Sequence, residues 1–187
     1  MIERSIRFNH IMVQAILDGR KTQTRRVIKL PPAPMHLGIW EATTFGGAGC
    51  FRIVNGLRDY NVPEIAGIWH TRTGKGLACP YGDVAARLWV HRYTRTLTDP
   101  RLESRLTLEI TGVRAERLQD CTEEDAKAEG VEWQGGNPDE NGLATQLIVT
   151  AKDSFRHLWD DIYARDNDRR WSQNPWVWVI EFKRLAA

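Results

Sequence analysis

The chain has 187 residues and a formal net charge of +2. This length suits one domain with one sizeable insertion, and it suffices to bury a core without disulfide staples. Hydrophobic residues make up 42% and charged residues 27%, which excludes an intrinsically disordered chain. The net charge is too small for a broad nucleic-acid-binding surface, so any contact with nucleic acid must come from a local basic patch.

Cysteine and histidine spacing argues against a disulfide framework and a metal site. The three cysteines, Cys50, Cys79 and Cys121, are odd in number and form no C-x-x-C pair. The five histidines share no metal-ligand spacing, so we expect no metal and no cofactor. Residues 1–5 carry no signal-peptide pattern, and no apolar run approaches the roughly 18 residues of a membrane span. We therefore expect a reduced, cytoplasmic protein without a membrane partner.

The N-terminal segment predicts a strand, a helix and a second strand. Residues 6–8 alternate as a short strand does, and Asn9 can cap the helix that follows. Gly19 ends this helix, because glycine accepts the left-handed conformation that closes a helix. Alternation around residues 26–28 indicates the second strand, which the prolines of residues 31–34 end.

Residues 35–82 differ in character from the rest of the chain. They are rich in glycine and aromatic residues and poor in apolar periodicity. We interpret them as an insertion of loops and hairpins within a single domain of residues 1–187, with strands predicted at residues 51–54 and 65–69.

The next elements return to regular alternation. Residues 88–90 predict a short buried strand, and residues 105–118 a longer strand with Leu, Leu and Ile on one face. Thr122 can cap a short helix, with Asp125 three residues later as a capping box. Gly130 ends that helix.

The C-terminal third predicts a polar loop, a helix and a final strand. Residues 135–142 are the loop, and residues 151–164 form an amphipathic helix. Residues 176–182 are apolar on both faces in their first half, so this strand should be central. The predicted apolar face of the helix consists of Phe155, Leu158, Trp159 and Ile162. Three tryptophans fall on core positions of the two elements: Trp159, Trp176 and Trp178.

Strands and helices do not alternate along the chain as they do in a doubly wound fold. Roughly five to seven strands and three helices are predicted, which favours an α+β fold with a mixed sheet or a small barrel and helices packed on it.

Four segments of the sequence together resemble one protein family. Residues 16–26 contain a G-x-K-T-x-T-R segment after the first predicted helix. The other three segments are residues 79–90, 118–130 and 174–182. With them the chain resembles the ASCH domain family of the PUA-like superfamily, and phage or prophage members in particular. The resemblance implies a small, mixed PUA-like β-barrel with helices packed on it, whose partner is RNA or a modified nucleoside.

The resemblance also implies a reaction. Small bacterial members that look similar hydrolyse N(4)-acetylcytidine to cytidine and acetate. Their catalytic lysine and threonine fall on Lys21 and Thr24, and their catalytic glutamate falls on Glu129. Two positions depart from the pattern. Similar phage-type members carry a Gly-Asp turn before Leu-Trp-Val, where this chain has Ala85 and Ala86, and an Arg-Glu pair after it, where this chain has His91 and Arg92.

Amide hydrolysis needs a nucleophile, a base, and groups that hold the oxyanion. Lys21 can activate Thr24 only as a neutral amine, so its pKa must lie below the ordinary value of about 10.4. Burial and neighbouring arginines lower such a pKa, whereas an ionised Glu129 raises it, and the sequence leaves the net direction open. Arginines for an oxyanion or a phosphate and aromatics for a stacked base complete the predicted site: Arg20, Arg25, Arg26, Tyr81 and Trp89.

Three functions stay open at this point. The first is an amidohydrolase that acts on an acylated cytidine, the second a non-catalytic RNA-binding module, and the third a ribonuclease. A further alternative is that residues 20–26 are only a solvated basic surface, as most charge runs are.

Overall fold

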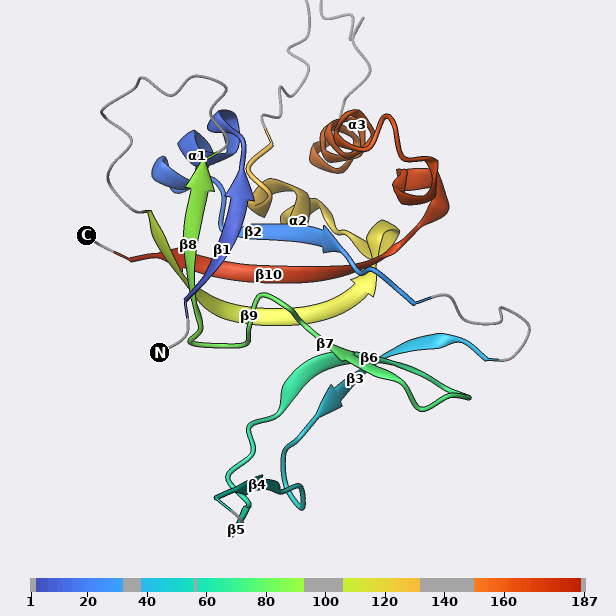
Figure 1. The fold of residues 1–187 in the computed structure, drawn as a ribbon. Helices are drawn as coiled ribbons and strands as arrows, with labels where there is room; N and C mark the ends of the chain where they lie inside the picture. Colours follow the sequence, from blue (N-terminus) through green and yellow to red (C-terminus); the bar gives the residue numbers. More distant parts are fainter. Residues whose placement is uncertain (1–2, 32–37, 56, 93–105, 132–149, 186–187) are drawn as a thin grey trace, which may run out of the picture.

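A five-stranded sheet is the centre of the fold (Figure 1). The computed structural model describes residues 3–31, 38–55, 57–92, 106–131 and 150–185. In spatial order the sheet consists of β1 (Glu3–Phe8), β8 (Arg87–Arg92), β9 (Thr107–Arg117), β10 (Trp176–Arg184) and β2 (Gln23–Val27). β1 is parallel to β8, and the other neighbouring strands are antiparallel. All five main-body strands that the sequence predicts are therefore confirmed.

The described helices complete the predicted α+β class. They are α1 (His10–Leu17), α2 (Glu123–Ala128) and α3 (Ala151–Ile162), with the 3-10 turns η2 (Leu118–Asp120), η3 (Asn167–Arg169) and η4 (Trp171–Gln173). In Figure 1, α2 and α3 lie above β10. The predicted polar loop at residues 135–142 lies outside the described residues.

Side chains cap these helices as the sequence predicts. The Asn9 side chain accepts a hydrogen bond from the Met12 N–H at 2.8 Å, which satisfies one of the free N–H groups of the first turn of α1. Thr122 and Asp125 form a reciprocal capping box at the start of α2. These caps fix where α1 and α2 begin.

The central position predicted for the last strand is confirmed, because β10 pairs with β9 on one side and β2 on the other. Its side chains alternate between two cores. Trp178 and Ile180 face a core that includes β1, β8 and α1, while Val177 and Val179 face a core under α3. Burial of Trp159 and Trp178 is confirmed at 3% and 2% exposure, whereas Trp176 is only partly buried.

The insertion forms a second sheet below β9 in Figure 1. Its three strands are β3 (Trp40–Phe45), β6 (Ile65–His70) and β7 (Gly76–Ala78), and a separate hairpin consists of β4 (Arg52–Val54) and β5 (Leu57–Asp59). The strands predicted at residues 51–54 and 65–69 are confirmed, and β3, β5 and β7 were not foreseen. Ile68 of β6 is fully buried in the same core as Leu108 of β9, which anchors the insertion to the main sheet.

The described strands do not close into a barrel. β1 and β2 are the two edges of the five-stranded sheet, and no described ladder joins them. The sheet bends enough that both edges line one pocket, and the Arg26 Nη2 donates a hydrogen bond across the gap to the Arg7 backbone oxygen at 2.6 Å. The predicted barrel is thus not confirmed; the observed form is a curved sheet that is open between β1 and β2.

None of the described helices is long and apolar enough to cross a membrane.

Candidate functional site

Lys21 is placed by the end of α1. Gly19 has φ +75°, a left-handed conformation that glycine adopts without the Cβ clash of other residues. The chain turns back there, and the N–H groups of Arg20 and Lys21 both donate to the Ala15 oxygen, at 2.9 Å and 3.0 Å. This turn directs Lys21 toward the end of α2.

The end of α2 packs directly on the segment that contains Lys21. Lys21 and Glu129 form an isolated antiparallel bridge, and the Thr22 N–H donates to the Ala128 oxygen at 2.9 Å. Gly130 has φ +77°, and a Cβ at this residue would lie 2.7 Å from the Lys21 Cβ. The close approach of the two segments therefore requires glycine at position 130.

Lys21 and Glu129 form a buried ion pair, each 3% exposed. The Lys21 Nζ donates to Glu129 Oε2 at 2.8 Å and also to the Glu129 backbone oxygen at 2.8 Å. The Nζ lies 5.7 Å from the centre of the Phe8 ring. The Lys21 ammonium has three N–H donors, and Glu129 accepts two of them. The third site on the nitrogen can carry either a proton or, in the neutral amine, the lone pair.

The pKa of Lys21 is lower in the folded protein than in water, so the neutral amine is easier to form. Burial lowers the pKa of Lys21, and the Glu129 carboxylate opposes this effect without cancelling it. The charges of Arg26 and Arg25 lower the pKa of Lys21 further. The direction that the sequence left open is therefore downward, which is the direction that a general base requires.

Arg25 of β2 is buried, with a side chain that is 0% exposed. Its guanidinium contacts Glu129 Oε1 through Nη1 at 3.3 Å, and Glu116 Oε1 through Nη2 at 2.6 Å and Nε at 3.2 Å. The same Nη2 lies 2.9 Å from Asp125 Oδ2. These carboxylates come from β9 and α2, so Arg25 ties both elements to the Lys21–Glu129 pair.

Thr24 lies opposite Ile180 in the β2–β10 ladder and is 4% exposed. Its neighbours Gln23 and Arg25 point to the α2 side, where Gln23 Nε2 donates to Asp125 Oδ1 at 3.1 Å. Thr24 itself lines the same pocket as Lys21. Within the described residues its hydroxyl forms no hydrogen bond, so it is available to a ligand.

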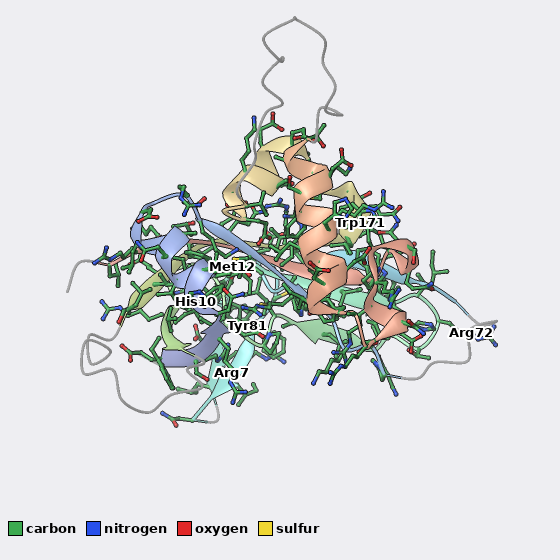
Figure 2. The ribbon with its side chains drawn as sticks, turned by 90° about the horizontal axis from the view of Figure 1, so that it is seen from above. Arg7, His10, Met12, Arg72, Tyr81 and Trp171 are labelled. Carbon is green, nitrogen blue, oxygen red and sulfur yellow. The ribbon has the colours of Figure 1, made fainter. Side chains whose placement is uncertain are left out.

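A pocket of about 230 Å³ opens beside these residues. Lys21, Thr24 and Glu129 all line it, as do Arg25 and Arg26. The remaining walls come from β1, α1 and α3: Arg7, Phe8, Asn9, Met12, Phe155, Leu158, Trp159, Ile162 and Tyr163. Figure 2 shows Met12 between α1 and α3. The three predicted catalytic residues therefore meet in one cavity with mostly apolar walls.

The predicted substrate-binding residues divide into two groups. Arg25 and Arg26 line the pocket, and the Arg26 guanidinium carbon lies 5.1 Å from the centre of the Phe8 ring. Arg20 does not line it; its side chain is 41% exposed and pairs with Asp18 at 3.1 Å. Tyr81 and Trp89 are not among the lining residues either.

Their positions in the fold explain this difference. Trp89 lies within β8, opposite Ser5 of β1 and Thr107 of β9, and so not on an edge strand of the sheet. Tyr81 is half-buried against the core that contains Phe8. It appears near Met12 in Figure 2, and it is close enough to Tyr163 to influence the pKa of that phenol, which burial raises.

The pocket wall that α3 forms was not predicted from the sequence. The apolar face of α3 was predicted as Phe155, Leu158, Trp159 and Ile162; Phe155 and Trp159 pack in the core, and all four residues line the pocket. An amphipathic period identifies the inward face of a helix but does not show whether a cavity remains beneath it. Ile162 gives a signal in the structure, because it is 58% exposed although apolar.

Within the residues that the structure describes, no group of three or more His, Cys, Asp or Glu side chains is arranged to hold a metal ion. The carboxylates of Glu116 and Asp125 are occupied by Arg25 and Arg114.

Comparison of the chain with protein families, curated proteins and solved structures finds no match to any of them.

Proposed function

We propose that this chain is a hydrolase of the ASCH type that cleaves the amide of an acylated cytidine such as N(4)-acetylcytidine. The observation that carries the proposal is the buried Lys21–Glu129 pair, which lies with Thr24 in one pocket. A buried lysine with a lowered pKa and a hydroxyl that line one pocket are the groups that an activated nucleophile needs. The open curved sheet fits a PUA-like fold whose barrel is interrupted at the pocket.

The reaction that we propose has two steps. The Lys21 amine takes the proton of the Thr24 hydroxyl while Thr24 Oγ1 forms a bond to the acyl carbon. The bond from this carbon to the exocyclic nitrogen of the base then breaks, and the Lys21 ammonium returns the proton to that nitrogen. In the second step water attacks the acyl-Thr24 ester with Lys21 as the base, which releases the carboxylic acid and restores the Thr24 hydroxyl.

Pocket size and lining support a single nucleoside as the ligand. Pockets that bury drug-sized ligands span roughly 300–1,000 Å³. The present pocket, at about 230 Å³, suits one base with its acyl group better than a longer oligonucleotide. The rings of Phe8, Trp159 and Tyr163 offer apolar and aromatic surface for a planar base.

A non-catalytic RNA-binding module is the second candidate. Its support is the basic side of the pocket mouth, where the exposed Arg7 adjoins Arg26. Such a module would bind RNA more weakly as salt increases, because phosphate contacts release counterions.

Incubation with N(4)-acetylcytidine and chromatographic detection of cytidine tests the first candidate. Cytidine should appear with the wild-type protein and not with a Lys21→Ala variant of equal folded concentration. Equal amounts of cytidine in both samples would refute the proposal. Salt-sensitive RNA binding without turnover would support the second candidate instead.

A further inference from the structure

We propose that Arg25 is a positioning residue: it is the permanent counterion of Glu129, and it thereby allows Lys21 to give up a proton inside the site. This inference rests on the proposed function, in which Lys21 acts as a base. It assigns to Arg25 a role behind the reacting atoms rather than contact with the substrate.

The geometry divides one carboxylate between two cations. Glu129 Oε2 accepts from Lys21 at 2.8 Å, and Glu129 Oε1 accepts from Arg25 at 3.3 Å. The side chains of Lys21, Arg25 and Glu129 are 2%, 0% and 4% exposed, so water does not replace either contact. Glu129 thus has a second partner on the side that faces away from Lys21.

This second partner matters when Lys21 becomes neutral. A buried carboxylate that loses its counterion is strongly unfavourable, because its charge is then neither solvated nor paired. With Lys21 as the single cation, deprotonation of Lys21 would strand Glu129 in this way. Arg25 prevents that, since a guanidinium stays protonated under all conditions in which proteins fold. Lys21 can therefore alternate between ammonium and amine while Glu129 stays ionised and in place.

Arg25 lines the pocket, and carboxylates outside Glu129 hold its guanidinium in place. Glu116 on β9 and Asp125 on α2 bind its Nε and Nη2 atoms, and the Phe155 ring lies 5.7 Å from its guanidinium carbon. Arg114 in turn contacts Glu116 at 2.9 Å and Asp125 at 2.7 Å. With its nitrogens engaged by carboxylates, Arg25 acts on the site through Glu129.

The charged groups around Lys21 act in opposite directions. Glu129 at the end of α2 favours the ammonium, while Arg25 and Arg26 on β2 favour the amine. Cys121 next to Arg25 does not add to this balance near neutral pH, because burial raises the pKa of its thiol to about 12. Removal of Arg25 should therefore shift Lys21 toward the ammonium.

Direct titration of Lys21 tests the proposal. The chain has six lysines, so the side-chain NMR signal of Lys21 can be assigned by its loss in a Lys21→Arg variant. In folded Arg25→Gln the fraction of Lys21 present as the amine at a fixed pH should fall at least about tenfold, as expected for loss of one neighbouring charge. An unchanged fraction would overturn the proposal.

Arg114→Gln is the matched control. It removes a cation from the same network, one that binds Glu116 and Asp125 and has no contact with Glu129 among the described residues. Its effect on the Lys21 amine fraction should be several times smaller than that of Arg25→Gln. Equal effects of the two variants would show that the total charge of the ion-pair network sets the amine fraction of Lys21, and that the contact between Arg25 and Glu129 has no special role.

A second variant covers the case in which Arg25→Gln does not fold. Glu116→Gln removes an anion that binds Arg25. It should raise the fraction of Lys21 present as the amine, which is the opposite of the effect expected for Arg25→Gln. A lower or unchanged amine fraction would overturn the proposal. The titration needs no substrate, so absent turnover with N(4)-acetylcytidine would count against the proposed function alone. An unchanged Lys21 titration alongside normal turnover would count against this inference alone.

Discussion

The side-chain nitrogen of Lys21 lies 2.8 Å from Glu129 Oε2 and 2.8 Å from the backbone oxygen of the same residue. The two residues are 108 positions apart in the chain, and they meet because the end of α2 forms a backbone bridge to the segment after α1. The stability of the fold and the proposed reaction therefore depend on the same contact. A substitution of Lys21 or Glu129 should affect both the free energy of unfolding and the turnover.

The first prediction concerns stability. Glu129→Ala should lower the free energy of unfolding by about 3–5 kcal/mol, because it leaves Lys21 buried without its anion. Lys21→Met should cost less, since Glu129 retains Arg25. Urea unfolding at neutral pH measures both values. A larger loss for Lys21→Met than for Glu129→Ala would contradict the role of Arg25 as a second partner.

The second prediction uses two glycines with the same backbone conformation. Gly19→Ala should cost roughly 1–2 kcal/mol from left-handed strain, with no clash, since nothing lies within 4 Å of its new Cβ. Gly130→Ala carries the same strain and also drives a Cβ to 2.7 Å from the Lys21 Cβ. We therefore expect it to be less stable still and to lose turnover per folded molecule, which Gly19→Ala keeps.

Unfolding curves and turnover normalised to folded protein separate these outcomes. If both variants kept full turnover, the position of the Lys21 backbone would not matter for the reaction.

The third prediction concerns acid stability. Burial opposes ionisation of Asp125, but the Thr122 N–H and the charge of Arg25 hold the pKa of Asp125 at about 2. A carboxyl whose folded pKa is lowered binds fewer protons when folded than when unfolded. It therefore contributes stability above its ordinary pKa of 3.8, and this contribution is lost as the pH falls through about 2.

Asp125→Asn should remove this contribution. The gap in unfolding free energy between wild type and variant should be of the order of 1 kcal/mol at neutral pH, after screening by water, and should shrink toward pH 2. Urea unfolding at a series of pH values measures it. A gap that stays constant over this range would mean that Asp125 acts through its cap geometry and not through its charge.

The fourth prediction concerns the mouth of the pocket. Ile162 lines the pocket and is 58% exposed, so Ile162→Arg should narrow the entrance and reduce kcat/KM at least about tenfold with little loss of stability. Ile11 is 54% exposed and is not among the lining residues, which makes Ile11→Arg the matched control. Equal kcat/KM values for the two variants would show that the substrate does not enter beside α3.

Local signals in the sequence were sufficient for the main body. The caps at Asn9 and Thr122 and the double-sided apolar pattern of β10 each depend on neighbouring residues, and each prediction was confirmed. In the insertion, β3 and β7 were missed because their residues carry weak alternation and gain their pairing from β6.

Long-range geometry was harder to foresee. Arg25 was expected to hold an oxyanion or a phosphate, which stays a prediction; it lines the pocket, and its guanidinium also binds Glu116, a partner 91 residues away. No local pattern specifies such a partner. A different case is Ala85, whose φ of +67° lies in the left-handed region that non-glycine residues seldom adopt, a conformation that no local pattern predicted.

The most direct test of the account is whether Lys21 and Thr24 act as one unit. Turnover of N(4)-acetylcytidine should be measured for wild type, Lys21→Ala, Thr24→Val and the double variant, each normalised to folded protein. Residues that share one catalytic step are strongly non-additive. We predict that each single change abolishes most of the activity and that the double variant is no slower than the slower single variant. Multiplicative losses, or wild-type turnover no higher than that of the double variant, would contradict the account.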